Sequence, residues 1–193
     1  MRLAGHELGK IREKDAAAFR RDNLGFVFQE FNLLDTFTLE DNIYLPLVLM
    51  GMSYEDMRAR LLPIARELGL TELLKKYPYE VSGGQKQRVS LAGVMVDQVK
   101  ILLFDEPTSA LDPELVGEVL DTIKKAANEG YTMLLVSHEM NFVKNVATRV
   151  IFLENGKIIE DGPPKEVFNH PKSDRVREFF AKINRMVEPE YSI

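Results

Sequence analysis

The feature that most constrains the fold is an apolar run that ends on two acids. Residues 100–104 carry no charge after Lys100, and the run stops at Asp105 and Glu106. A short continuous run of this kind is typical of a strand buried in a parallel sheet. Taken alone, it also fits a strand followed by an ordinary solvated turn. In open α/β sheets, however, ligands bind at the carboxyl ends of the strands, so we expect an α/β fold that presents these acids to a ligand.

A serine and two glycines precede a segment with helical character. Ser82, Gly83 and Gly84 lead into residues 85–97, which are compatible with a helix. Because glycine has no Cβ, backbone N–H groups at the helix start can approach an anion closely. Ser82 can cap the helix or hold a phosphate oxygen. Taken alone, such a triplet is most often a loop.

Two further polar residues follow predicted strands. Gln29 comes after residues 24–28, which are apolar and aromatic, and His138 comes after residues 131–136, which we expect to form another buried strand. A turn over residues 109–112 lies between them. Each residue alone is an ordinary strand end or surface side chain. Their order and spacing, together with the two patterns above, indicate a nucleotide site.

In this order the motifs resemble those of the ATP-binding subunits of ABC transporters, over about residues 3–180. Residues 81–85 are similar to the family signature, with Val81 where Leu is commoner; residues 101–106 are similar to its Walker B strand, and residues 109–112 to its D-loop. The resemblance implies a P-loop NTPase-like α/β fold, with a parallel-sheet core and a helical signature lobe. It also implies ATP and Mg²⁺ as cofactors.

The resemblance further implies a role for each candidate site residue. Glu106 is the expected general base for the attacking water, and His138 is expected to touch the γ-phosphate. Gln29 is expected to complete the shell of Mg²⁺ and water, and Asp105 to hold the metal. In the family, two subunits sandwich ATP, and each contacts the nucleotide held by the other. The residues expected to make those contacts are Ser82, Gly83, Gly84, Gln85 and Asp112.

One motif of the family has no counterpart in these 193 residues. The Walker A pattern, G-x-x-x-x-G-K-[ST], cradles phosphates with backbone N–H groups and a lysine. Residues 5–10 come nearest, but they place three residues between the glycines instead of four, and Ile11 follows the lysine. We therefore expect a chain shortened at its N-terminus, without Walker A and the first strands. We also expect it to hydrolyse ATP weakly or not at all by itself, although the family is a Mg-dependent ATP hydrolase.

Local signals predict several element boundaries. Thr38 and Ser53 each have an aspartate three residues on, which is typical of helix N-caps. Pro46 and Pro63 are expected to break the helices of this region. Residues 155–156, Asn-Gly, are the turn of a predicted β-hairpin. We expect a single ABC-type ATP-binding domain over residues 1–193, divided into a helical signature lobe (38–98), a catalytic α/β core (99–162) and a C-terminal helical tail (163–193).

Composition limits the partners and the location. A net charge of −5 argues against a nucleic-acid binder, because phosphate backbones require clustered Lys and Arg. The chain has no cysteine and no signal-peptide pattern, which fits the cytosol. Its longest nearly uncharged stretch, residues 42–52, is shorter than the roughly 20 apolar residues that span a bilayer. We expect a cytoplasmic protein on the inner face of the cell membrane, bound to transmembrane permease subunits and to a second ABC ATPase subunit.

The sequence leaves the cargo and the exact role open. Residues 25–34 and 44–47 resemble the lipoprotein-releasing and macrolide-export branch, whereas residues 105–119 and 136–140 resemble polar amino-acid importers. The first reading is an ATPase subunit that energises a transporter for amino acids or another small or lipidic cargo. The second is an incomplete half that donates only its signature face to a complete partner. The third is a soluble ABC protein without a transport role.

Overall fold

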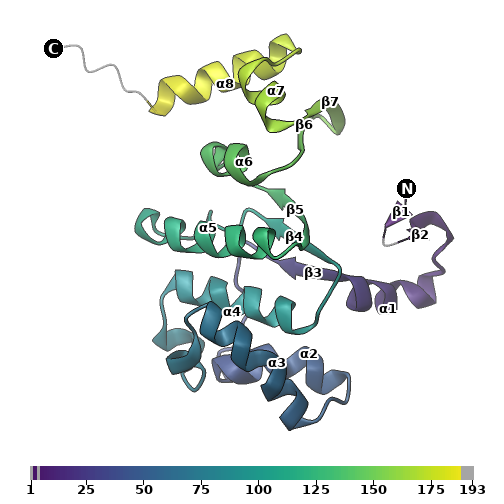
Figure 1. Cartoon of the computed structure of the whole chain (residues 1–193), viewed down its shortest axis with the longest axis vertical. Helices are drawn as coiled ribbons and strands as arrows, with labels where there is room; N and C mark the ends of the chain where they lie inside the picture. Colours follow the sequence, from purple (N-terminus) through teal and green to yellow (C-terminus); the bar gives the residue numbers. More distant parts are fainter. Residues whose placement is uncertain (1, 4, 188–193) are drawn as a thin grey trace. The chain divides into compact units, whose positions relative to one another are not determined.

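The computed structural model describes residues 2–3 and 5–187, and the chain divides into two compact units, Met1–His138 and Glu139–Ile193 (Figure 1). We describe each unit by itself. Residues 188–193 of the predicted tail lie outside the described residues.

The elements of the first unit are β1 (Arg2–Leu3), β2 (His6–Glu7), a 3-10 helix (Leu8–Lys10), α1 (Glu13–Asn23), β3 (Leu24–Val27), α2 (Leu39–Leu49), α3 (Tyr54–Glu67), two 3-10 turns (Thr71–Leu73, Pro78–Glu80), α4 (Gly83–Val96), β4 (Ile101–Asp105), α5 (Pro113–Asn128) and β5 (Thr132–Val136).

A three-stranded parallel sheet in the order β3-β4-β5 forms the centre of the first unit. Phe104 of β4 pairs with Val27 of β3 and with Leu135 of β5. One face of the sheet is covered, because Val27 and Phe104 pack against Leu91 of α4 and Ile123 of α5. The predicted strand that ends on Asp105 is therefore confirmed as the middle strand of a parallel sheet.

Helix α4 lies very close to β3. A Cβ built on Gly25 would stand 1.8 Å from Cγ1 of Val94 and 2.9 Å from Cγ2 of Val99. No side chain larger than hydrogen fits between this strand and the helix. The sheet and α4 consequently pack directly against one another. This contact fixes the start of α4 relative to the carboxyl ends of the strands.

The predicted caps are confirmed and the predicted helix breaks are wrong. Thr38 forms a capping box with Asp41, and Ser53 accepts a hydrogen bond from the N–H of Asp56. Pro46 lies inside α2 and Pro63 inside α3, and both helices continue through them. An interior proline costs about 3 kcal/mol, but the buried side chains beside these prolines gain more than that by packing. These buried neighbours are Leu47, Leu61 and Ala65.

Strand β5 is not the buried strand that the sequence predicts. Its residues alternate between exposed and half-buried, because β5 lies at the edge of the sheet. Leu134 is 58% exposed and Val136 52%. On the same face, Phe26 and Phe28 of the β3 region are also exposed and stack on one another with ring centroids 5.3 Å apart. Within the described residues, the second face of the sheet is apolar and open to solvent.

This open sheet face predicts self-association of the 193-residue chain. Contiguous exposed apolar surface and an unpaired edge strand both drive contacts between copies. We expect sedimentation at micromolar concentration to give species heavier than the 22.0 kDa monomer, and Leu134→Lys to shift them toward the monomer. Ile158→Lys, at an equally exposed residue of the second unit, is the control and should change little. A monodisperse wild-type monomer would contradict this prediction.

The second unit contains α6 (Met140–Val146), β6 (Val150–Glu154), β7 (Lys157–Gly162), α7 (Pro164–Asn169) and α8 (Asp174–Val187). The predicted hairpin is confirmed: β6 and β7 are antiparallel, and Asn155 and Gly156 both have positive φ. Phe152 of the hairpin packs edge-on against Phe179 of α8, which ties the helix to the hairpin. None of the described helices is long and apolar enough to cross a membrane.

Candidate active site

The structure brings two of the predicted catalytic side chains into contact. Glu106 follows β4 directly, and His138 follows β5 by two residues, so the parallel pairing of these strands sets them at the same edge of the sheet. Nδ1 of His138 lies 2.5 Å from Oε2 of Glu106. Both side chains remain open to solvent, Glu106 at 30% and His138 at 56%. A carboxylate and an imidazole in contact can orient one another and share a proton with a substrate.

The backbone of Glu106 is held in an unusual conformation. Its φ is +46°, in the left-handed region that non-glycine residues rarely adopt and that costs about 1–3 kcal/mol. Three hydrogen bonds hold it: the N–H of Glu106 donates to the carbonyl of Val136 (3.0 Å), and its own carbonyl accepts from the N–H (3.1 Å) and hydroxyl (2.9 Å) of Ser109. The sequence indicates a turn at Ser109 but does not indicate that this residue fixes the carboxylate next to the sheet.

The signature segment forms the capped start of α4. Ser82 accepts a hydrogen bond from the N–H of Gln85, and the Gln85 side chain accepts one from the N–H of Ser82 at 3.0 Å. The helix itself supplies no acceptor for the N–H groups of Gly83 and Gly84. No acid occurs in the first turn, and Ser82 is exposed. This helix start can therefore receive an anion without repulsion from its own first turn.

The signature glycine also approaches the D-loop closely. A Cβ on Gly83 would stand 3.0 Å from Cδ2 of Leu111 and 3.5 Å from the Phe31 ring. A larger residue at Gly83 would displace either the D-loop or the loop that carries Gln29. Asp112, which follows Leu111, is the N-cap residue of α5, although its side chain makes no capping hydrogen bond.

The remaining predicted residues lie at the same sheet edge without direct contact. Asp105 is exposed at the end of β4, and Gln29 is exposed two residues after β3, which neighbours β4. In the described part of the chain, Gln29 makes no hydrogen bond to Asp105 or Glu106. Ser82 bonds Gln85 and likewise makes no hydrogen bond to these two acids. Among the described residues, no group of three or more His, Cys, Asp or Glu side chains is assembled for a metal.

Gln87 is a residue of this region that sequence reasoning missed. It is 2% exposed, and its Nε2 donates to the carbonyl of Phe28 at 3.3 Å, next to Gln29. This contact joins the signature helix to the loop after β3. The spacing of Gly84, Gln87 and Leu91 places them on one face of a helix, and the structure shows that this face is buried. A polar residue in such a row indicates a buried hydrogen bond.

The donor set fits ATP and Mg²⁺. The N–H groups at the start of α4 and the hydroxyl of Ser82 could hold a phosphate, and the glycines leave the space that a Cβ would fill. Asp105, as an exposed carboxylate, is an oxygen ligand of the kind that Mg²⁺ prefers. Bound Mg²⁺ would neutralise charge on the transferring phosphoryl group.

Comparison with known proteins identifies similar chains. The family described as ABC transporter matches residues 1–109. The glutamine transport ATP-binding protein GlnQ of Geobacillus stearothermophilus is 44% identical over 177 residues, which cover 90% of this chain and 73% of that protein. The L-cystine import ATP-binding protein TcyC of Bacillus subtilis is 42% identical, over 93% of this chain and 72% of its own length.

Solved structures give the same result for the fold. The dimeric ATP-binding cassette MJ0796, in a post-hydrolysis state bound to ADP and Pi, is 30% identical with a TM-score of 0.71, over 84% of this chain and 72% of its own. CbiO1 from Clostridium perfringens, part of the transporter complex cbiONQ, is 27% identical with a TM-score of 0.78, over 96% and 74%. The predicted ABC ATPase fold, α/β with a parallel sheet and helices, is thereby confirmed.

Proposed function

The chain belongs to the family of ABC transporter ATP-binding proteins, and from this premise we propose that it is the ATP-binding subunit that energises an amino-acid importer. The similarity to amino-acid transport proteins extends over 90% of the chain for GlnQ and 93% for TcyC. It therefore includes the front half, whose short motifs also resemble the lipoprotein-releasing and macrolide-export branch. The length of this match is the observation that favours amino acids as the cargo.

We assign the chemistry to the residues at the sheet edge. Glu106 polarises the attacking water, and its contact with His138 orients both side chains toward the γ-phosphate. Asp105 and Gln29 would hold Mg²⁺ and its water, and the metal would neutralise charge on the phosphoryl group. Ser82, Gly83, Gly84, Gln85 and Asp112 contact nucleotide across a dimer interface, as the capped and acid-free start of α4 supports.

The permease docks on an apolar patch at the end of α2. This α2 patch consists of exposed side chains, and Leu49 is 80% exposed. Asn42 of α2 hydrogen-bonds both the N–H (2.7 Å) and the carbonyl (3.1 Å) of Leu34, so the loop after Gln29 is fastened beside the patch. A permease segment bound to the α2 patch would therefore be connected to Gln29 through the loop that Asn42 holds at Leu34. The members of the α2 patch are Leu45, Val48, Leu49, Met50 and Tyr54.

The α2 patch supports a location at the inner face of the cell membrane. A chain whose composition fits the cytosol and whose apolar patch binds a membrane-embedded partner is held at the inner face of the cell membrane. A second ABC ATPase subunit, as in the MJ0796 dimer, is the other partner.

A second function is favoured by one specific observation: the start of α4 is ordered, capped and free of acids, so it can contact nucleotide that a partner holds. As an incomplete half, the chain would donate Ser82 and the start of α4 to nucleotide held by a complete partner. A pair of this chain and a complete subunit would then contain one complete nucleotide site, whereas a pair of complete subunits contains two.

The test of the proposed function is binding to two detergent-solubilised permeases, one from an amino-acid importer and one from a macrolide exporter. We expect the chain to be retained only by the first and to lose most of this binding with Leu49→Asp, which puts a charge in the α2 patch. Leu153→Asp, at an exposed residue of the second unit, is the control. Equal retention by both permeases, retention by neither, or no effect of Leu49→Asp would reject the proposal.

A further inference from the structure

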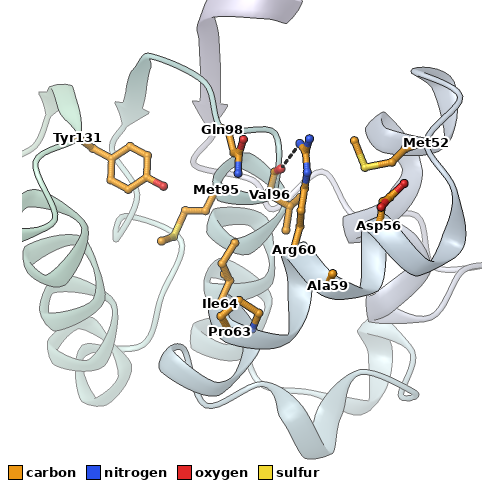
Figure 2. Close-up of a pocket in the computed structure, with 10 residues that line it drawn as sticks. All are labelled: Met52, Asp56, Ala59, Arg60, Pro63, Ile64, Met95, Val96, Gln98 and Tyr131. Atoms are coloured by element: carbon orange, nitrogen blue, oxygen red, sulfur yellow. Dashed lines mark hydrogen bonds between the residues drawn. The ribbon is translucent and has the colours of Figure 1, made fainter.

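An open cavity of about 530 Å³ lies between α3, the C-terminal end of α4 and Tyr131, all within the first unit (Figure 2). Its volume falls in the range of small-molecule sites, about 300–1,000 Å³. None of its residues belongs to the nucleotide site described above. The wall combines apolar side chains with four polar ones, which are Asp56, Arg60, Gln98 and Tyr131.

Asp56 and Arg60 put opposite charges on the α3 wall, and among the described residues no ion pair joins them. Asp56 and Arg60 are four residues apart on a helix, where an acid and a base ordinarily pair. Here Asp56 accepts a hydrogen bond from the Ser53 hydroxyl at 2.7 Å, and Arg60 donates to the carbonyl of Val96 at 3.3 Å (Figure 2). Arg60 has five donors and this contact uses one of them. A carboxylate and a guanidinium thus both remain available to a ligand.

Asp97, the C-cap residue of α4, places a buried carboxyl near Arg60. Oδ1 of Asp97 is buried without a hydrogen-bond partner among the described residues, and burial raises the pKa of this carboxyl to about 6, although Arg60 acts against the shift. Gln98, the next residue, has φ +54° and lines the cavity (Figure 2). Non-glycine residues in this conformation cluster at ligand sites.

Two carboxyls act on Tyr131 of the opposite wall, although neither of them lines the cavity. The Tyr131 hydroxyl points into the cavity in Figure 2, and burial together with the charges of Glu129 and Glu67 raises the pKa of Tyr131. A hydrogen bond between Glu67 and Glu129, followed by burial and by the charge of Glu67, raises the pKa of Glu129 to about 7. The two carboxyls therefore share a proton and carry one negative charge near Tyr131, which favours a cation at this end of the cavity.

From this arrangement we propose that the cavity binds a free α-amino acid with a cationic side chain, of which L-arginine is the probe. Arg60 receives the α-carboxylate as a bidentate partner and Asp56 receives the α-ammonium group. The aliphatic stem lies against Ile64 and Met95, and the cationic tip reaches Tyr131. The cationic tip matches the negative charge that Glu67 and Glu129 share near Tyr131. The proposal does not depend on the transport function, because it uses none of the residues of the nucleotide site or the α2 patch.

The experiment is equilibrium dialysis of the 193-residue chain against radiolabelled L-arginine at neutral pH. We expect saturable binding of one ligand per chain. Three analogues each remove one contact: agmatine lacks the carboxylate, N-acetyl-L-arginine lacks the charged ammonium group, and L-norleucine lacks the cationic tip. Each should compete at least tenfold less well. Absence of saturable binding up to several millimolar L-arginine, or competition by agmatine equal to that of L-arginine, would overturn the proposal.

Substitutions test the two ends of the ligand separately. Arg60→Gln and Asp56→Asn should each weaken binding at least tenfold. Their matched controls are Arg58→Gln and Glu55→Gln, on the same helix but outside the cavity lining, and these should bind as the wild type does. Circular dichroism checks that each variant is folded. If Arg60→Gln unfolds, the comparison of agmatine with L-arginine on the wild type still decides, and controls that weaken binding as much as the cavity variants count against the site.

Discussion

The 193-residue chain by itself is expected to hydrolyse ATP no faster than the buffer does. The contact between Glu106 and His138 is already formed, so the expected defect is in holding the nucleotide. The segment nearest to a phosphate-binding loop is a short strand followed by a 3-10 helix, Leu8–Lys10, and the Lys10 ammonium group pairs with Glu7 at 2.6 Å. A three-residue 3-10 helix does not supply the backbone cradle of a P-loop.

The size of this effect follows from what positioning contributes. Holding reactants in the reactive geometry accounts for about 7–11 kcal/mol of a barrier, which corresponds to roughly 10⁵–10⁸ in rate. Phosphoryl transfer depends on positioning and charge neutralisation more than on covalent chemistry, so little remains without the cradle. Phosphate release at saturating Mg-ATP, measured beside an intact relative, is the assay. Turnover comparable to that relative, and abolished by Glu106→Gln, would refute the prediction.

Much of the fold could be predicted because its signals are local. Thr38 and Ser53 cap helices through side chains three residues away, and residues 155–156 form a turn by their own backbone preferences. Residues 101–105 show their burial in their own composition, and the strand is the middle one of the sheet. These features need no knowledge of the rest of the chain.

The misses all depend on what lies against an element in space. Pro46 and Pro63 have the local signature of a break, yet their helices continue because neighbouring side chains are buried in the lobe. Residues 131–136 look like a buried strand, but their burial depends on a layer over the second face of the sheet. The contact of Gln87 with the carbonyl of Phe28 spans 59 residues of sequence, and no local pattern specifies the partner.

The candidate site divides in the same way. Strand ends predict which residues reach the sheet edge, since parallel strands deliver them there, and this applies to Glu106 and His138. Spacing does not predict the positive φ of Glu106, which depends on hydrogen bonds to Val136 and Ser109. The resemblance to a family supplied the roles, whereas the structure supplies the contacts that hold the residues in position.

The second prediction with a large expected effect concerns association with another subunit through the start of α4. This part of the chain can contact nucleotide that is held by the P-loop of a partner. In the presence of ATP, we expect this chain to associate with a P-loop-bearing homologue whose catalytic glutamate is replaced so that ATP persists. The start of α4 directs N–H groups and partial positive charge outward from an exposed Ser82, with no acid in its first turn. Ser82→Arg should abolish the association by filling the approach of the γ-phosphate.

A matched pair of substitutions separates this effect from loss of the helix cap. Asp and Asn are of equal size and both cap helices well, so Ser82→Asp and Ser82→Asn should both keep α4 intact. A carboxylate facing the γ-phosphate costs several kcal/mol, so we expect Ser82→Asp to weaken association at least about a hundredfold relative to Ser82→Asn. Glu106→Gln in this chain should change nothing, because the composite site of the mixed pair uses the partner's glutamate position and not Glu106. The measurement is sedimentation of the mixture with and without ATP. If the two chains never co-sediment, or if Ser82→Asp associates as well as Ser82→Asn does, the start of α4 does not receive the nucleotide. The incomplete-half function is then rejected.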